Sequence, residues 1–439
     1  MEFSQKFVNL TIKMREKSFV KVVRQTLAML FPFAALGSIA SVINDSILSS
    51  EGFIGNIFYI ANWLPHIARI RSMFSAFSML TIQIIAVLAA YQAAVYTAKI
   101  YHKNSELTGM TGMLAFLIIA LRPAQQQYGL QTLLKFNVNT RLLGIQGLFV
   151  GIFVGFITGQ IFRIICKKKI TDDTDVFEKA YQTVAPVLVA LTIAILINQI
   201  IIQLYHYEIP DAISDYYQNL STKKHDLLTT LIVGAWSSLM AWFGLSGPYN
   251  NQINYDSNPA TVANATFALK NHDVWNVPYK YTATTLYHSF GTFGGVGSTL
   301  ALVIAIILVS RTEHYHRVAR WSAFPVLFNT NQSILLGIPV LFNPIYLIPF
   351  VCTPVINMLI AALAIHLKIM PPVTYPVPLA TPGVLNAFIG TGGNFIALFI
   401  GILVLAIDVI IYIPFVKFSD RIKVELEVQS LKTKTKLMK

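Results

Sequence analysis

The chain of 439 residues is 55% hydrophobic and 12% charged, and its formal net charge is +13. Soluble domains carry about 25% charged residues, so this composition predicts a polytopic membrane protein. The basic residues cluster at the ends of apolar runs, as membrane orientation requires, which argues against nucleic-acid binding. Cys166 and Cys352 provide neither a disulfide framework nor the spacing of metal ligands, and we expect no cofactor or metal.

The N-terminal segment, residues 1–24, contains six Lys and Arg residues interleaved with apolar residues at roughly helical spacing. This pattern predicts an amphipathic helix on the cytoplasmic face, and it lacks the apolar core of a cleavable signal peptide. Residues 419–439 form a basic tail, so both termini are predicted to be cytoplasmic.

Long apolar runs predict the membrane spans. A charged segment at 170–182, after the basic cluster Lys167–Lys169, is the expected linker between an N-terminal half, 25–182, and a C-terminal half, 183–418. The spans are expected near 25–43, 73–98, 109–121, 142–165, 183–205, 228–245, 300–309, 347–367 and 395–415.

Four glycines in the fourth span, Gly147, Gly151, Gly155 and Gly159, are spaced by four residues and therefore share one helix face. Small residues at this spacing let two helices approach closely. The face is either a packing surface inside the subunit or a dimer contact, and the sequence leaves both open.

The region 248–290 begins with a run of Asn, Gln and Tyr residues and is predicted to be a first re-entrant segment beside a cavity. It is followed by a glycine cluster at 291–297, which would let the backbone approach a ligand closely. Close packing at the start of a helix is the alternative.

The stretch 325–348 is apolar but contains Pro339 and Pro344, each of which removes a backbone donor, and Gly337. A polar block, residues 329–333, precedes the apolar part. Broken backbone in lipid is tolerated only when it is buried in protein or lines a wet cavity. We therefore predict a re-entrant hairpin beside a polar site; the alternative is one membrane helix with a proline kink and a polar loop.

This stretch resembles the signature of the membrane permeases of the sugar phosphotransferase system, the enzyme IIC subunits of the lactose/cellobiose type. Their pattern runs roughly F-N-x-N-E-P-x-x-F-G-x-P-x-x-x-N-P. The family's Glu, Pro and Phe are replaced by Gln332, Ser333 and Leu336. The matching positions are Phe328, Asn329, Asn331, Gly337, Pro339, Asn343 and Pro344.

Three further stretches resemble the family in the same order. The first is its W-x-x-G-I-H-G motif, where Ser246 replaces the His and Trp242 lies one place after the expected Trp. The second is F-x-D-x-F-x-x-x-G-G-x-G-A-T, where His288 replaces the Asp. The third is V-P-W-T-T-P, at residues 377–382.

The resemblance implies an all-α membrane protein of about ten transmembrane helices with two re-entrant hairpins, in a bacterial cell membrane. It implies a homodimer with most dimer contacts in the N-terminal half, and a sugar enclosed by the C-terminal half. Family members bind a disaccharide, move it across the membrane and expose it to a cytoplasmic phosphotransfer subunit, which donates the phosphoryl group.

An uncharged sugar needs amide and hydroxyl partners and aromatic rings against its faces. The candidate sugar-binding residues supply this chemistry or lie in the matching glycine cluster. They are Trp242, Ser246, Asn250, His288, Gly294, Gly295, Asn329, Asn331 and Gln332.

No nucleophile–base pair is evident, so no catalysis by the chain itself is expected. Gln332 and Ser246 stand where the family has a carboxylate and an imidazole, which could prepare a sugar hydroxyl for attack. This change favours sugar binding without coupled phosphorylation, as a degenerate permease or as a sensor that signals through a C-terminal domain or partner. The alternative is a working permease in which another residue, with His288 the nearest candidate, has taken over.

Overall fold

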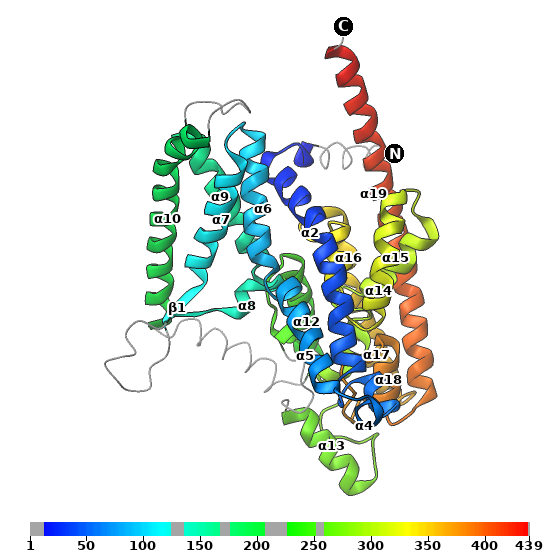
Figure 1. Ribbon diagram of the computed structural model, residues 1–439. Helices are drawn as coiled ribbons and strands as arrows, with labels where there is room; N and C mark the ends of the chain where they lie inside the picture. The colour runs from blue at the N-terminus through cyan, green and yellow to red at the C-terminus, as the bar shows by residue number, and fades with distance from the viewer. Residues whose placement is uncertain (1–12, 124–135, 167–175, 207–225, 252–258, 438–439) are drawn as a thin grey trace, which may run out of the picture. The chain divides into compact units, whose positions relative to one another are not determined.

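Helices dominate the computed structural model, which describes residues 13–123, 136–166, 176–206, 226–251 and 259–437 (Figure 1). By their internal contacts the residues form two units. The smaller unit comprises residues 14–34 and 79–216, and the larger unit comprises residues 1–13, 35–78 and 217–439. The division falls inside one helix, α2 (Ser18–Val42).

Within the described ranges, six helical stretches are long and apolar enough to cross a membrane, and three further apolar helices are shorter. Every one of the nine predicted spans overlaps one of these helices, because uninterrupted apolar runs favour helices in a lipid environment. The six are Ser18–Ile47, Ile67–Ile100, Ile145–Ile165, Phe177–Leu204, Pro344–His366 and Phe395–Glu425, and the three shorter helices are Ser105–Ala120, Leu227–Trp242 and Thr299–Val309.

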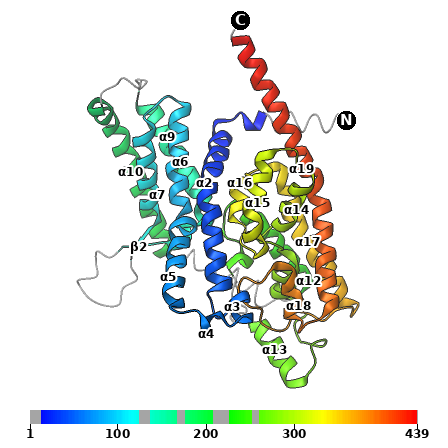
Figure 2. The same cartoon turned by 45° about the vertical axis from the view of Figure 1, so that its right-hand side comes forward.

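The smaller unit is a helical bundle with one pair of short antiparallel strands in its described part, in which Leu121 lies opposite Val138. The axes of α6, α7 and α9 run side by side in both views (Figures 1 and 2). Its elements after α2 are η2 (Met79–Gln83), α6 (Ile85–Ile100), α7 (Ser105–Ala120), β1 (Leu121–Pro123), β2 (Phe136–Val138), α8 (Thr140–Leu143), η4 (Ile145–Gly147), α9 (Leu148–Ile165) and α10 (Val176–His206).

The glycine face of α9 packs against α6 inside this unit. A side chain at Gly151 would overlap the Ala86 carbonyl oxygen, and one at Gly155 would overlap the Ala90 carbonyl oxygen. This contact confirms the interpretation as internal packing, and the interpretation of this face as a dimer contact is wrong because α6 already covers it.

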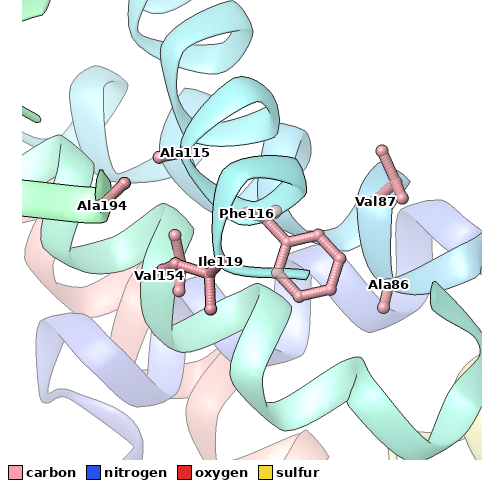
Figure 3. Close-up of a cluster of buried hydrophobic side chains, with 8 residues drawn as sticks. Ala86, Val87, Ala115, Phe116, Ile119, Val154 and Ala194 are labelled. Atoms are coloured by element: carbon pink, nitrogen blue, oxygen red, sulfur yellow. The ribbon is translucent and has the colours of Figure 1, made fainter. Parts of the chain in front are cut away.

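Small and medium apolar side chains fill the space between these helices (Figure 3). Phe116 is the largest member of the cluster and is fully buried, while the neighbouring positions are mostly alanine, isoleucine and valine. A large aromatic ring next to small alanines is the alternation of sizes by which a close-packed interior is built. The cluster comprises Ala86, Val87, Ala90, Ala115, Phe116, Ile119, Val154 and Ala194.

The larger unit combines long helices with short helical pieces joined by irregular segments. In both views α13 lies at the end of this unit opposite to the C-terminus of α19 (Figures 1 and 2). Its elements after α2 are η1 (Ile43–Ile47), α3 (Phe53–Ile57), α4 (Ile60–Trp63), α5 (Ile67–Ser78), α12 (Leu227–Trp242), η5 (Pro248–Asn251), α13 (Pro259–Asn271), η7 (Thr284–Gly291), α14 (Thr299–Val309), α15 (Glu313–Leu327), α16 (Gln332–Gly337), α17 (Pro344–His366), α18 (Gly383–Gly390) and α19 (Phe395–Leu437).

The stretch 325–348 is broken, as its prolines predict. Helix α15 ends at Leu327, the short helix α16 follows, and α17 starts only at Pro344. Asn329 (φ 62°) and Phe342 (φ 59°) adopt left-handed backbone conformations at the two breaks. The alternative of one membrane helix with a proline kink is therefore wrong, whereas re-entry into the membrane stays a prediction.

The start of α15 is tied to α19 by one carboxylate, that of Asp420. One carboxylate oxygen accepts hydrogen bonds from Ser310 Oγ (3.1 Å) and Thr312 Oγ1 (2.9 Å), and the other accepts from the Arg311 backbone N–H (2.7 Å). Because this carboxylate receives three donors from the segment that leads into α15, it holds that helix end in place.

Several predictions fall wholly or partly on residues that the structure does not describe. The segments 1–12, 167–175 and 207–225 lie outside the described residues, so most of the N-terminal amphipathic helix and the basic cluster remain predictions. The linker prediction is wrong for residues 176–182, which form the first turns of α10. The two units also divide the chain differently from the predicted halves, since residues 35–78 pack with the C-terminal part.

Candidate functional site

A cavity of about 600 Å³ lies in the larger unit. Its wall comes mainly from irregular segments and helix ends, where backbone and side-chain polar groups are not used up by regular helical hydrogen bonds. It is lined by Asp45, Tyr249, Asn250, Thr284, Tyr287, His288, Thr292, Gly295, Val296, Phe328, Asn329, Thr330, Asn331, Gln332, Pro378, Leu379, Ala380, Thr381 and Asn386.

Asn329 joins three segments of this wall. Its Oδ1 accepts a hydrogen bond from the Gly294 backbone N–H (2.9 Å), and its Nδ2 donates to the Thr381 carbonyl (3.0 Å). Asparagine tolerates the left-handed backbone conformation found here better than most residues. The break after α15 thus places an amide where it holds the glycine segment and the segment around Thr381 together.

Asn331 is also held by the glycine segment. Its Nδ2 donates to the Val296 carbonyl at 3.2 Å. A Cβ at Gly295 (φ 103°) would lie 2.5 Å from that Nδ2, so the close approach and the backbone angle both require glycine at this position.

Two cavity-lining side chains carry buried polar atoms without a hydrogen-bond partner: Gln332 Oε1 and His288 Nε2. His288 lies on η7, and its ring stands edge-on to that of Tyr287, with 5.4 Å between centroids. A buried polar group left unpaired costs about 1–3 kcal/mol. These two atoms are therefore the ones that a bound polar ligand would satisfy.

A tyrosine pair and an asparagine form one side of the cavity. Tyr287 OH donates to Asn250 Oδ1 (3.1 Å), and Asn250 Nδ2 donates to the Ser237 carbonyl (3.1 Å). The rings of Tyr249 and Tyr287 lie 5.3 Å apart, which supplies flat apolar surface next to polar groups. Such a mixture suits a ligand with both apolar faces and hydroxyl edges.

Asp45 adds a carboxylate that sequence reasoning missed. It lies on η1, where Ser41 Oγ donates to its Oδ2 (2.9 Å) and Asn44 Nδ2 donates to its Oδ1 (2.7 Å). The signal available in the sequence was an acidic residue only two positions beyond a predicted membrane span, where ionisable residues are often functional.

Contacts between segments far apart in sequence bring Asp45 to the cavity. The Phe53 N–H donates to the Leu379 carbonyl and the Leu379 N–H to the Glu51 carbonyl, both at 2.9 Å. Ser46 Oγ donates to the Ala380 carbonyl (3.2 Å). These bonds hold η1 and the residues after it against residues 379–380, which also line the cavity.

Among the described residues, no group of three or more His, Cys, Asp or Glu side chains is placed to hold a metal ion. The charged or titratable groups that line the cavity are Asp45, His288 and the two tyrosines, and the remaining polar groups are amides and hydroxyls. The arrangement suits hydrogen bonding to a neutral, hydroxyl-rich molecule.

Comparison with known families identifies the chain. The family described as "Phosphotransferase system, EIIC" matches residues 24–354, which is most of the sequence. The chain belongs to the EIIC family. It is therefore a multi-pass membrane permease subunit of the phosphotransferase system, a class that resides in the inner membrane of bacteria. EIIC proteins bind sugar substrates in the membrane and work with EIIB and EIIA phosphotransfer partners.

Three curated relatives carry EIIC names. The oligo-beta-mannoside-specific EIIC component of Bacillus subtilis is 24% identical over 437 residues, 97% of this chain and 95% of the relative. The cellobiose-specific EIIC component of Lactococcus lactis is 33% identical, over 56% of this chain and 54% of the relative. The lactose-specific EIICB component of Staphylococcus epidermidis is 26% identical, over 73% of this chain and 54% of the relative. The chain thus matches about half the length of the last two.

One solved EIIC structure is also similar. The crystal structure of the transporter ChbC, the IIC component from the N,N'-diacetylchitobiose-specific phosphotransferase system, aligns with a TM-score of 0.44 and 21% identity. The alignment covers 97% of this chain and 99% of that chain.

Within this EIIC chain, six of the nine candidate residues line the cavity and three do not. Trp242 packs its ring against Phe243 and Phe342, with centroids 4.9 and 6.2 Å away. Ser246 is exposed beyond the end of α12. Gly294 directs its N–H to Asn329 and is not among the lining residues.

Proposed function

We propose that this EIIC subunit binds an uncharged, disaccharide-sized sugar in the cavity of the larger unit. The observation that carries the proposal is the pair of unpartnered buried atoms, Gln332 Oε1 and His288 Nε2, on residues that line the cavity. Small-ligand pockets measure about 300–1,000 Å³, so a volume of about 600 Å³ suits a ligand of this size.

The names of the relatives support the same substrate class. They specify oligo-beta-mannosides, cellobiose and lactose, each a sugar of more than one hexose ring. In the proposed complex a sugar hydroxyl donates to Gln332 Oε1, and another exchanges a hydrogen bond with His288 Nε2. The Asp45 carboxylate accepts from a third hydroxyl, and the rings of Tyr249 and Tyr287 cover an apolar sugar face.

We further propose that binding is not coupled to phosphorylation. By the family resemblance, position 332 holds a carboxylate and position 246 an imidazole in relatives that present a sugar to a phosphoryl donor. A glutamine amide forms hydrogen bonds but is a poor base near neutral pH, and Ser246 lies outside the cavity. The chain would then act as a degenerate permease, or as a sensor that transmits occupancy to a C-terminal signalling domain or partner.

A working permease is the second candidate, because two lining residues could replace the missing groups. Asp45 supplies a carboxylate and His288 an imidazole in the same cavity. Either could accept a proton from a sugar hydroxyl during transfer.

Assembly as a homodimer is part of the proposal. The glycine face of α9 is not available for it, but α10 exposes a row of large apolar side chains within the smaller unit, including Leu188, Leu196 and Ile200. Light scattering of the detergent-solubilised protein should give the mass of two chains, and a single-chain mass at all concentrations would contradict this assembly.

Sugar binding is tested with the purified full chain and titrations of cellobiose, lactose and a beta-mannobiose, with glucose as the one-ring control. Gln332→Ala should weaken binding roughly tenfold, because one or two neutral hydrogen bonds are lost. Ser246→Ala is the matched control outside the cavity and should bind as the parent does. If Gln332→Ala and His288→Ala both retain parental affinity, the cavity is not the sugar site.

The uncoupled mechanism is tested by supplying EIIA and EIIB subunits and labelled phosphoenolpyruvate to membranes that carry the protein. We expect no sugar phosphate above the level of empty membranes, and a gain of sugar phosphate in Gln332→Glu. Sugar phosphate formed by the parent and lost in Asp45→Asn or His288→Ala would instead establish the working permease.

A further inference from the structure

A buried polar cluster lies behind the glycine segment, on the elements that support it. Asp408 of α19, Asn357 of α17 and Ser298 are all fully buried. Asn357 Nδ2 donates to Asp408 Oδ2 (2.7 Å) and to the Phe290 carbonyl (3.1 Å), and it lies 3.1 Å from Ser298 Oγ. The Phe290 carbonyl and the Asp408 carboxylate oxygen can only accept hydrogen bonds. They therefore fix the orientation of the Asn357 amide, and its Oδ1 points away from both.

This orientation leaves two buried acceptor atoms without a donor, Asn357 Oδ1 and Asp408 Oδ1. Both belong to the same pair of side chains, joined through the bond between Asn357 Nδ2 and Asp408 Oδ2. Unpaired buried acceptors are rare in folded proteins, and two on adjacent side chains indicate that a donor or a positive charge is required there.

No such charge comes from the described residues around Asp408. Helices α14 and α18, which pack against α19, contain no titratable side chain. Helix α17 contributes Tyr346, and its Cys352 and His366 are exposed. On α19 itself Tyr412 lies one turn away and donates to the Gly297 carbonyl. Every neighbouring group is neutral or distant, while a bare carboxylate in a membrane-spanning helix is among the costliest groups to bury.

We propose that Asp408 and Asn357 form a binding site for a monovalent cation, either a proton carried by Asp408 or Na⁺ held between the two side chains. A single positive charge neutralises the single carboxylate. In the described part of the chain, no three His, Cys, Asp or Glu side chains gather as a divalent or transition-metal site would require. A proton bound at Asp408 Oδ1 removes one of the two free acceptors, whereas Na⁺ would take both oxygens as ligands.

The site also supports the cavity wall. Asn357 holds the Phe290 carbonyl and Tyr412 holds the Gly297 carbonyl, at the two ends of a segment that contributes Thr292, Gly295 and Val296 to the cavity. Cation binding therefore orders a segment that a ligand would touch. A linkage between cation and sugar affinity rests on the proposed function, whereas the cation site itself does not.

The test uses the melting temperature of the purified full chain without sugar, so that it is independent of sugar binding. In one arm NaCl replaces choline chloride at constant ionic strength and constant pH. In the other arm the pH varies from mildly acidic to mildly alkaline without sodium. A Na⁺ site predicts a saturable rise on the order of a few degrees with NaCl. A proton site predicts that the parent loses stability relative to Asp408→Asn as the pH rises.

Asp408→Asn is nearly isosteric and neutral, so it should abolish either response. Tyr412→Phe is the matched control on the same helix face: it removes a hydrogen bond to the same segment and should lower the melting temperature while keeping the cation response. The site is overturned if sodium has no effect on the parent and the parent and Asp408→Asn share the same pH dependence of the melting temperature, or if a sodium response persists in Asp408→Asn. The parental sodium titration decides the Na⁺ arm even if Asp408→Asn does not fold, and Asp408→Ser then takes its place in the pH comparison.

Discussion

The α6–α9 contact and the cavity wall both depend on glycine, but for different physical reasons. At the contact, Gly151 and Gly155 lie in regular helix and let the backbone of α6 come close. In the glycine segment beside the cavity, Gly294 (φ 75°) and Gly295 (φ 103°) adopt left-handed backbone angles, and Gly295 lines the cavity. At the α6–α9 contact, the absence of a side chain lets two helices pack closely. In the glycine segment, it permits backbone angles that other residues rarely adopt, next to a cavity. The spacing of the glycines in the sequence distinguishes the two regions. Glycine recurs at every fourth residue in the helix contact, whereas two glycines are adjacent in the segment beside the cavity.

The largest effect is expected at the helix contact. Gly155→Ala places a methyl group against the Ala90 carbonyl oxygen, and neither backbone can yield without moving a helix. We expect a loss of about 3 kcal/mol in the free energy of unfolding, measured as a lower melting temperature, with sugar affinity per folded molecule unchanged.

Gly144→Ala is the matched control for this substitution. A Cβ there lies 3.6 Å from its nearest neighbour, at ordinary van der Waals distance, and the backbone angle is not left-handed. Equal melting temperatures for the two variants would show that α6 and α9 are not in close contact.

The next effect is expected in the cavity wall, where stability and binding should change together. Gly295→Ala forces a left-handed angle on alanine and displaces Asn331, at a cost of about 1–3 kcal/mol. Sugar affinity should fall as well, because the displaced amide lines the cavity. Gly291→Ala, whose Cβ has 3.5 Å to its nearest neighbour, should change neither quantity strongly. An unchanged affinity in Gly295→Ala would separate the glycine segment from the site.

A smaller, graded effect is expected at Asn329. Asn329→Ala loses the acceptor for Gly294 and the donor for Thr381, which is worth about 1–2 kcal/mol in melting experiments. Asn329→Asp keeps the acceptor and loses only the donor, so its melting temperature should lie between those of the parent and the alanine variant. An aspartate variant less stable than the alanine variant would argue against the hydrogen bond to Gly294.

The smallest effect is expected outside both regions. Gln5→Cys and Thr435→Cys should leave melting temperature and sugar binding unchanged, which makes them suitable probes of orientation. Both lie in basic termini that we predict to be cytoplasmic, so both should resist membrane-impermeant thiol reagents in intact cells. Labelling of either cysteine from outside would reverse the predicted topology.

The helices and the broken stretch could be predicted because local chemistry decides them. Apolar runs specify membrane-length helices. Pro339 lies in the break between α16 and α17, and Pro344 is the first residue of α17, where proline is well tolerated. The spacing of the glycines specified a face but not its partner, because two helices of similar composition present equivalent surfaces. The contacts of Gly151 with Ala86 and of Gly155 with Ala90 identify α6 as that partner.

The cavity could be predicted only in part. Asn331 and Gln332 stand in a polar block beside a break, which is a local signal. Asp45 reaches the cavity through bonds between η1 and the segment around Leu379, more than three hundred residues later, and no local pattern encodes such a contact. Trp242 was expected to contact ligand because of its type, but neighbouring aromatic rings enclose it.

Helix α15 is fastened at both ends, by Asp420 at its start and by Asn329 just beyond its end. Fifteen residues of helix span about 22 Å and resist bending. Because the helix is stiff, we propose that a shift of residues 328–332 on ligand entry would be passed along α15 to α19 at Asp420. This connection would give the proposed sensor a route from the cavity to the long C-terminal helix.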